Sequence, residues 1–366
     1  MTYQGFFNLT PFEGGMFLVP DLEGAMNLVL VAKATFRVHP GRAPRAAHES
    51  QGLERADEQE PICTAAIPWG EPGTSSLRRE TEVVIEKPLA DVGLLGHAYP
   101  ERARDTSVDV TLRVGPLRKT VRAFGARHYR RGIGAPSISS PAPIDRVPLS
   151  FERAFGGWDV RDEDPAKHAY EPRNPVGTGF LRIDPADGPA SLGEVDGVAL
   201  PNLEDPARPI RSILDRPPPA AFGFVAPDWA PRHKLAGTFD DAWRAGRFPL
   251  PPSDFQRAHH NAAPLDQQLR EIPAGAPVEL HNVAPGGPIA FDLPRLSLEA
   301  VACVDGEERA AGMTMDTLVI DADAMRVHAL LRAAFRVHGR VHDLAWARVQ
   351  DGRGPSARDP RRGARR

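Results

Sequence analysis

The chain has 366 residues, of which 41% are hydrophobic and 25% are charged, and its formal net charge is −3 at pH 7. These proportions are typical of a globular protein, and they argue against a wholly disordered chain and against a basic, nucleic-acid-binding molecule. The N-terminal sequence lacks the basic region and apolar run of a secretory signal, and no stretch approaches the ~18 apolar residues of a membrane-spanning helix. We therefore expect a soluble, cytoplasmic protein that binds neither nucleic acid nor membrane.

Proline is frequent throughout the chain, with 38 residues beside 33 glycines, and it is interleaved with aromatic and apolar residues. Because proline fixes φ and lowers the entropy of the unfolded chain, we expect long ordered loops rather than long helices or flexible linkers. The two cysteines, Cys63 and Cys303, lack metal-ligand spacing. We favour two free thiols in a reducing cytosol, and the sequence leaves a single disulfide open as the alternative.

The first strand signal spans residues 28–38, LVLVAKATFRV. From position 30 onward its even-numbered residues are apolar, whereas Lys33, Thr35 and Arg37 lie between them. This period of two predicts a half-buried strand. Residues 41–60 are polar and carry no such pattern, so we expect an exposed loop there.

A second signal predicts an antiparallel hairpin. Residues 107–114 and 117–124 both alternate between apolar and polar side chains, and Gly115-Pro116 separates them. A Gly-Pro break between two amphipathic runs is typical of a hairpin turn. We expect residues 81–88 and 91–99 to form further strands of the same sheet.

Strand signals return near the C-terminus. Residues 296–304 lead into Asp305-Gly306, a dipeptide that favours a hairpin turn. Residues 325–337 show the cleanest alternation in the chain, with arginines and His328 between apolar residues. Together with the N-terminal runs, they predict a mainly β protein with antiparallel, sandwich-like sheets built from both ends of the chain.

The middle of the chain, residues 131–275, is rich in proline, glycine and aromatic residues and has few alternating runs. We expect it to be dominated by ordered loops with a few short helices. Residues 240–246 predict one or two helical turns that end at Gly246. Residues 264–271 predict another helix, with Pro264 suited to its first turn.

We interpret the chain as a single domain over residues 1–350. It divides into an N-terminal β part (1–130), the Pro/Gly-rich middle (131–275) and a C-terminal β part (276–350). The remaining segment, 351–366, is basic, and we expect it to be a disordered tail.

Motifs of known catalytic chemistry are missing from the sequence. It contains no GxSxG nucleophile elbow, no phosphate-binding loop and no HExxH zinc helix. His259 and His260, with Asp254 and His281 nearby in sequence, come closest to a set of metal ligands. Since adjacent histidines of a strand point to opposite faces, they seldom bind one ion. We therefore expect no catalytic residues, no metal and no cofactor.

Acidic residues of the middle region support an alternative function. They share this region with Trp229, Phe239 and Trp243, and they are Glu204, Asp205, Asp240, Asp241 and Asp254. Two carboxylates beside aromatic rings could serve a glycosidase-like hydrolase. We favour the simpler interpretation, in which these acids cap helices and make turns, and the separation of the carboxylates would decide between the two.

Residues 149–159, LSFERAFGGWD, combine charged, aromatic and glycine residues. Glu152 and Arg153 allow either a buried ion pair or a contact with a binding partner. The Gly156-Gly157 pair, flanked by aromatic residues, predicts a tight turn packed by their rings. A recognition pocket is the alternative.

Several stretches, in order along nearly the whole chain, resemble a bacterial family first catalogued as a domain of unknown function. The matching stretches are LVLVAKATFRV (28–38), KPLADVGLLGHAYP (87–100), VGPLRKTVRAFG (114–125), PLSFERAFGGWD (148–159), NPVGTGF (174–180), LPNLEDP (200–206), APDWAPRHKLAGTFDDAW (226–243), FPLPPSDF (248–255), NAAPLDQQ (261–268) and DTLVIDADAMRVH (316–328). Genes of this family lie beside type VI secretion spike genes, and its members are regarded as effector adaptors or chaperones.

The resemblance implies a non-enzymatic adaptor that binds a toxic effector in the cytoplasm and helps to load it onto the VgrG/PAAR-type spike. The family supplies no catalytic residues to carry over. His259 and His260 stand where the family favours aromatic residues, which weakens the metal hypothesis further. Near residue 330 the chain departs from the family's Trp-Arg-Gly pattern, which puts any function of that strand in doubt.

An adaptor needs a rigid scaffold and a surface that combines aromatic residues with arginines, which dominate interface hot spots. We expect this surface in the Pro/Gly-rich middle, near Phe155, Trp158, Arg173, Trp229, Arg232 and Trp243. The alternatives are the hydrolase described above and a structural component of the secretion apparatus.

Overall fold

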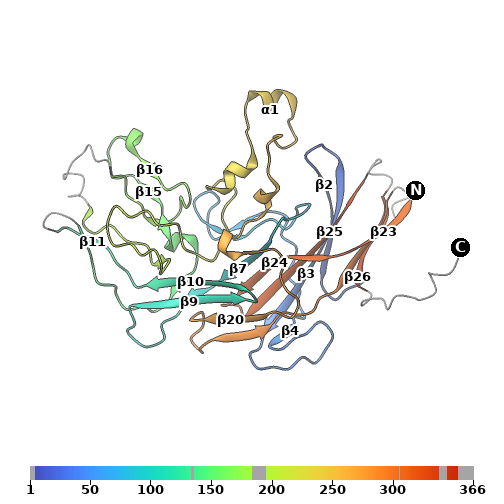
Figure 1. Cartoon of the computed structure of the whole chain (residues 1–366), viewed down its shortest axis with the longest axis horizontal. Helices are drawn as coiled ribbons and strands as arrows, with labels where there is room; N and C mark the ends of the chain where they lie inside the picture. The colour runs from blue at the N-terminus through green and yellow to red at the C-terminus, as the bar shows by residue number, and fades with distance from the viewer. Residues whose placement is uncertain (1–4, 133–135, 184–194, 305, 338–343, 353–366) are drawn as a thin grey trace.

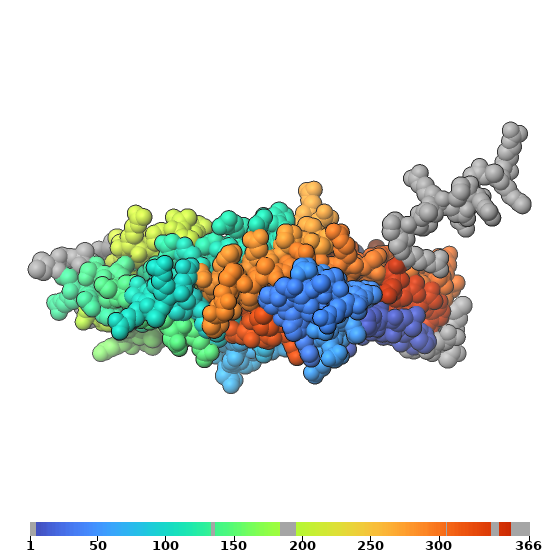
Figure 2. Space-filling model, turned by 90° about the horizontal axis from the view of Figure 1, so that it is seen from below, coloured from blue at the N-terminus to red at the C-terminus, as the bar shows by residue number. Residues whose placement is uncertain are grey.

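The computed structural model describes residues 5–132, 136–183, 195–304, 306–337 and 344–352. The molecule is elongated, with the N-terminal and C-terminal strands at one end and the loop-rich middle of the chain at the other (Figure 1, Figure 2). The larger β-sheets form the body, and short strands and single-turn helices make up the rest. A mainly β fold with several antiparallel sheets and a loop-dominated middle is therefore confirmed.

The central sheet joins strands from both ends of the chain in the order β19-β7-β24-β25-β3-β2, and β4 also pairs with β3. Its strands are β2 (Glu13–Pro20), β3 (Met26–Val38), β4 (Leu53–Arg55), β7 (Ala90–Leu95), β19 (Gln268–Leu269), β24 (Thr314–Asp321) and β25 (Arg326–Arg336). β3 and β25 are antiparallel, from Asn27 opposite Arg336 to Arg37 opposite Arg326. The strands predicted from opposite ends of the sequence are thus direct neighbours.

A second sheet contains the predicted hairpin. In the order β18-β10-β9-β20-β21, its strands are β18 (Leu203–Glu204), β10 (Leu117–Phe124), β9 (Ser107–Val114), β20 (Pro277–His281) and β21 (Ile289–Asp292). β9 and β10 pair antiparallel around Gly115, whose φ of +53° favours glycine.

The prediction that residues 81–88 and 91–99 join this second sheet is wrong. Residues 91–95 belong to β7 of the central sheet. Residues 81–88 form no strand, because they cross the outer face of the central sheet: Arg332 of β25 donates hydrogen bonds to the carbonyls of Glu82 and Val84. This segment is therefore held by side-chain contacts with that face rather than by strand pairing.

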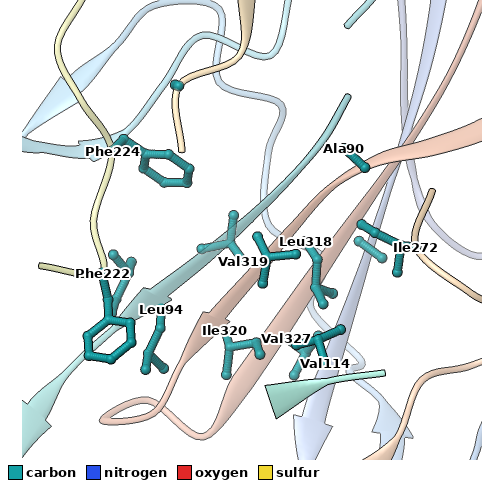
Figure 3. Packing of buried hydrophobic residues seen from close by; sticks show 14 of the residues in the cluster. Ala90, Leu94, Val114, Phe222, Phe224, Ile272, Leu318, Val319, Ile320 and Val327 are labelled. Atoms are coloured by element: carbon teal, nitrogen blue, oxygen red, sulfur yellow. The ribbon is translucent and has the colours of Figure 1, made fainter. Parts of the chain in front are cut away.

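The inner faces of these two sheets form the main hydrophobic core. Even-numbered residues of β3, from Leu28 to Val38, lie in this core, as their alternation predicts. Figure 3 shows Val114 of β9 in one cluster with Ile320 and Val327 of the central sheet. Each Å² of apolar surface buried in this way contributes roughly 25 cal/mol, so the packing of the two sheets stabilises the fold.

A four-stranded sheet closes the end of the molecule near the termini (Figure 1). In the order β1-β26-β22-β23, its strands are β1 (Gly5–Asn8), β26 (Leu344–Asp351), β22 (Leu298–Val304) and β23 (Glu307–Gly312). β22 and β23 pair antiparallel on either side of the predicted turn, in which Asp305 lies outside the described residues. Of the predicted tail, Asp351 still belongs to β26, and residues 353–366 lie outside the described residues.

The outer face of the central sheet is also covered. Lys33 and Thr35 of β3 are both 0% exposed, so the prediction of a half-buried strand is wrong for this face. The reason is that residues 56–63 and 79–86 pack over it and supply partners for the polar side chains. The ammonium of Lys33 lies 2.9 Å from a carboxylate oxygen of Glu82.

The segment predicted as an exposed loop, residues 41–60, is partly structured. It contains β4, which pairs with the end of β3, and Leu53 of β4 is 0% exposed. Shortly after it, Cys63 is buried, and Cys303 of β22 is partly buried; both are free thiols in this structure.

The middle of the chain folds into two-residue strands and single-turn helices, as its composition predicts. Its further short strands are β12 (Ser137–Ile138), β13 (Val147–Pro148), β14 (Phe155–Gly156), β15 (Trp158–Asp159), β16 (Ala169–Tyr170) and β17 (Thr178–Gly179). Short strands also precede the middle: β5 (Ile67–Pro68), β6 (Leu77–Arg79), β8 (His97–Ala98) and β11 (Tyr129–Arg130). The 3-10 helices are η1 (Phe151–Arg153), η2 (Pro165–Lys167), η4 (Arg232–Ala236), η5 (Arg257–His260) and η6 (Leu265–Gln267).

The two predicted helices have different outcomes. Residues Asp241–Gly246 form helix α1, with Asp240 as the N-cap and Gly246 as its last residue. In residues 264–271 only η6 is helical, and the chain continues directly into β19, which pairs with β7. Pairing with the central sheet therefore overrides the helical pattern after one turn.

Candidate functional site

Three of the residues expected at a recognition surface are buried. Phe155 is 2% exposed and Trp229 is 3% exposed, and the Trp229 ring packs edge-to-face on Phe151 with 5.5 Å between ring centroids. Arg232 is 6% exposed and forms an ion pair with Glu80. These side chains are satisfied inside the fold, so they present no accessible surface to a partner in this conformation.

The remaining three are at least partly accessible, but they do not form one cluster. Arg173 is partly buried and donates two hydrogen bonds of 2.7 Å to the Glu171 carboxylate. Trp158 is 56% exposed and stacks on Tyr170 across β15 and β16, with 4.4 Å between ring centroids. Trp243 lies on a projecting segment, residues 237–256, that we call the arm.

The arm stands out from the body of the molecule and carries α1 near its tip (Figure 1). Its base is closed by two contacts, one within the arm and one with the residues just before it. The amide of Gln256 donates to the carbonyl of Leu235 at 2.9 Å, and the Thr238 hydroxyl donates to the Asp254 carboxylate at 2.8 Å. The arm is therefore an ordered projection with a closed base.

Three aromatic rings form the apolar surface of the arm. Phe239 packs edge-to-face on Trp243 with 4.8 Å between ring centroids, and Phe248 does so from another side at 5.8 Å. The indole of Trp243 donates a 2.8 Å hydrogen bond to the carbonyl of Leu250, which fixes the central ring. Phe239 and Phe248 are 56% and 68% exposed, so the cluster presents rigid aromatic surface to solvent.

Contacts with the β2–β3 turn hold the arm in place. The Arg247 guanidinium donates to the carbonyl of Pro251 within the arm at 2.8 Å and to the carbonyl of Leu22 in the turn at 2.6 Å. A side chain at Gly24 of the same turn would meet Leu250 at 3.3 Å, so the arm packs closely there. The direction of the arm is thus fixed against the central sheet.

A pocket of about 400 Å³ lies between the β5–β6 hairpin and the central sheet, and we call it the hairpin pocket. Its floor is apolar, because Leu94, Leu95 and Leu149 line it and are at most 2% exposed. Trp69, 45% exposed, forms one wall, and the exposed Arg153 lies at the rim. Two stretches of the family resemblance, 87–100 and 148–159, therefore meet in this pocket.

The two charged residues of the LSFERAFGGWD motif have separate roles. The Glu152 carboxylate accepts hydrogen bonds from the Ser76 amide at 2.7 Å and from its hydroxyl at 2.8 Å, which ties the β5–β6 hairpin to η1. The Arg153 guanidinium makes no hydrogen bond or ion pair with any residue in the described part of the chain. The ion pair between the two residues is therefore not formed, and Arg153 is available to a ligand.

The histidines considered as metal ligands belong to η5 and β20. Among the residues that the structure describes, no group of three His, Cys, Asp or Glu side chains is placed to hold a metal ion. His259 and His260 both contact the ring of Phe255, at 5.4 Å between centroids. Burial, with the positive charge of Arg232 and the neighbouring His260, lowers the pKa of His259 to about 4.

The acidic residues considered for hydrolysis are engaged in local structure. Glu204 is buried in an ion pair with Arg127. Asp240 caps α1, and Asp254 accepts hydrogen bonds from Thr238. These hydrogen bonds lower the pKa of the Asp254 carboxyl, whereas a general acid needs a raised pKa.

Sequence reasoning missed Trp69, Phe239 and Phe248 as accessible aromatic residues. The signal that could have found them is an aromatic residue isolated among turn formers, as in PWGEPG and FPLPP. A large apolar side chain in such a segment has little neighbouring sequence to pack with, so it is either anchored by a distant element or left exposed.

Residues 23–332 match the model of a protein family described as uncharacterized protein conserved in bacteria (DUF2169). Searches of curated proteins and of solved structures gave no match. Across the described ranges, no helix combines the length and the apolar character needed to cross a bilayer. Because the family match spans well over half of the sequence, the chain belongs to this family of uncharacterized bacterial proteins.

Proposed function

We propose that the protein is a non-enzymatic adaptor that binds a type VI secretion effector in the cytoplasm and helps to load it onto the VgrG/PAAR-type spike. The type VI assignment comes from the sequence resemblance described above. The observation that carries the adaptor proposal is the arm, which holds exposed aromatic rings on an ordered projection. Such a feature suits the recognition of another protein.

The physical argument concerns the entropy of binding. Ordering a flexible loop at an interface costs roughly 0.5–1.5 kcal/mol for each immobilised side chain. In the arm, the indole hydrogen bond of Trp243 and the ring contacts of Phe239 and Phe248 already exist. A partner that covers these rings therefore gains apolar burial without that cost. Aromatic side chains of this kind are typical of interface hot spots.

A hydrolase is a weaker proposal, because the acids it would use cap a helix, close a turn or pair with arginine. A structural component of the secretion apparatus would also use protein contacts. Recovery of the chain in sheared, secreted assemblies would favour that role over an adaptor that stays in the cytoplasm.

The proposal is tested by affinity capture from a native lysate, followed by identification of the bound proteins. The wild-type chain should recover an effector or spike protein encoded near its own gene, and the Phe239→Ala/Phe248→Ala variant should recover at least about tenfold less. Removing two hot-spot rings at about 1–2 kcal/mol each predicts this loss. Because both rings are exposed, unfolding stability should change by less than about 0.5 kcal/mol per substitution.

Leu214→Ala is the matched control, since Leu214 is an apolar side chain 65% exposed that lies outside the arm. It should capture as much as the wild type. Equal capture by the arm variant and the control would contradict the role of the arm. If a folded bait repeatedly recovers neither effector nor spike protein, the adaptor proposal itself fails.

A further inference from the structure

We propose that the hairpin pocket and a hollow beside it bind an extended acidic segment of a partner protein. A bulky apolar side chain of the segment enters the pocket, and an Asp or Glu two residues away lies over arginines of the hollow. This inference rests on the adaptor proposal and names the kind of segment that the adaptor recognises.

The first half of the site selects an apolar side chain. A volume of about 400 Å³ lies in the range of ligand pockets, and buried leucines form its floor, with polar side chains such as Ser75, His97 and Glu152 elsewhere in the lining. Trp69 adds a large apolar wall that is 45% exposed before any partner binds. Covering this ring and filling the pocket both remove apolar surface from water, which favours a large aliphatic or aromatic side chain.

The second half is a hollow of about 280 Å³ that we call the arginine hollow, lined in part by Ile67, Arg78, Arg79 and Arg326. It adjoins the hairpin pocket, because the Arg78 guanidinium lies 5.4 Å from the centre of the Trp69 ring. Ile67 and Trp69, 43% and 45% exposed, are two residues apart in sequence, beside a register shift in the pairing of β5 with β6. The contact between Arg78 and Trp69 therefore places the two hollows next to each other on the hairpin.

The accessible charge of this surface is positive. Its carboxylates are mostly engaged: Glu60 contacts His328 at 2.8 Å and Arg79 at 3.3 Å, and Glu152 is held by Ser76. The exposed Glu58 is the exception.

Three arginines around the surface keep spare hydrogen-bonding capacity. Among the described residues, Arg153 and Arg326 form no ion pair, and Arg78 reaches Asp321 only at 3.8 Å. Each of these guanidinium groups can take a carboxylate, and a bidentate pair is the strongest such contact. Charge complementarity thus favours an acidic segment over a basic one.

The geometry favours an extended segment over a compact ligand. In an extended chain, side chains two residues apart lie on one side and are separated by roughly 6.5–7 Å. The exposed pair Ile67 and Trp69 has this same spacing in sequence. A partner strand alongside the hairpin would therefore place alternate side chains in the two hollows, as in other cases of peptide recognition along a strand.

The test uses the full-length protein and a phage-displayed library of random heptapeptides, selected in parallel on the wild type and on Trp69→Ala. Peptides enriched by the wild type alone should carry a bulky apolar residue two positions from an Asp or Glu. Synthetic copies of these peptides should lose at least about tenfold in affinity on Arg78→Glu, measured by fluorescence anisotropy.

A charge reversal sharpens the assignment. Replacing the acidic residue of the peptide by Lys should abolish binding to the wild type and restore it with Arg78→Glu. The control variant is Arg118→Glu, an exposed arginine of β10 that should leave every affinity unchanged. Circular dichroism and thermal unfolding check that each variant is folded, and Arg326→Glu offers a second test of the hollow.

Three results would each overturn the inference. Basic peptides are enriched, or the same peptides are enriched on Trp69→Ala, or the peptide affinity is unaffected by both Arg78→Glu and Arg326→Glu. The adaptor proposal is judged separately, because the peptide experiment contains no secretion component. If peptides bind as expected but no effector is captured, the adaptor proposal is rejected and the peptide-binding site at the hairpin stands. If capture depends on the arm and no peptide binds at the hairpin, the adaptor proposal stands and the peptide site is rejected.

Discussion

The two ends of the molecule are stabilised in different ways. In the sheets at the end with the termini, long ladders such as β3–β25 align apolar residues over many positions, and burial of their side chains dominates. In the loop-rich middle the strands are two residues long, and side chains bond directly to the backbone. Asn174, for example, is 0% exposed and donates hydrogen bonds to the carbonyls of Phe151 and Phe155.

This difference indicates where partner recognition can develop. A strand buried on both faces has little freedom to change, because every side chain packs against others. A loop held by a few polar contacts can carry exposed rings without disturbing the core, and the arm and the β5–β6 hairpin both do so. Removing one polar side chain from each region measures how much each depends on such contacts.

The largest effect is expected at Lys33 in the central sheet. Lys33→Ala leaves the buried Glu82 without its partner at 2.9 Å, which should lower the free energy of unfolding by about 3–5 kcal/mol. The control is Arg37→Ala, a substitution further along β3 on the same side of the strand. Its side chain is 46% exposed and lies 3.8 Å from Asp57, so the loss should stay below about 1 kcal/mol. Urea unfolding measures both, and similar losses would contradict the buried ion-pair account.

A smaller effect is expected from Asn174 in the loop-rich middle. Asn174→Ala removes a donor from the buried Phe155 carbonyl and one of the two donors to the Phe151 carbonyl, which keeps the Ala154 amide, and we expect a loss of about 2–3 kcal/mol. Asn202→Ala is the comparison, because Asn202 is only partly buried and its 3.0 Å bond to the Phe124 carbonyl is worth about 1 kcal/mol. Chemical unfolding of both variants should preserve this order, and a loss at Asn174 no greater than at Asn202 would show that the loops do not depend on it.

The smallest effect concerns the pH dependence of stability. The pKa of His259 is lowered to about 4 from an ordinary 6.5, chiefly by burial, so the unfolded chain binds more protons than the folded chain between these values. His259 thus contributes stability above pH 6.5 that is lost as the pH falls toward 4. We expect His259→Phe, which keeps a ring beside Phe255, to lose less thermal stability between pH 7 and pH 5 than the wild type. Parallel melting curves would contradict this.

The sheets were largely predictable from sequence, and the reasons are local. Alternation identifies 28–38, 107–124 and 325–337 correctly, because a strand with one face in the core must repeat with a period of two. Which sheet a strand joins depends on distant partners, and for this reason residues 91–95 were assigned to the wrong sheet. The burial of Lys33 is equally non-local, since its partners Glu60 and Glu82 lie in two other segments.

The candidate site was much harder to predict. The hairpin pocket combines Trp69 with residues near 95 and near 150, and no periodicity connects these segments. The aromatic and arginine residues chosen from composition include Phe155, Trp229 and Arg232, which are buried. Residue type alone cannot separate a hot spot from a core residue, because the same large side chains serve both purposes.

The pairing of β3 with β25 also has a consequence for biosynthesis. Thr35 and His328 face each other across this pair although they are 293 positions apart in the sequence. At bacterial translation rates of about 5–20 residues per second, the first strand waits on the order of 15–60 s for its neighbour to be made. During that interval an apolar strand of 13 residues stays unpaired on that edge. Synthesis therefore exposes an unpaired apolar edge to association with other chains until β25 has been made.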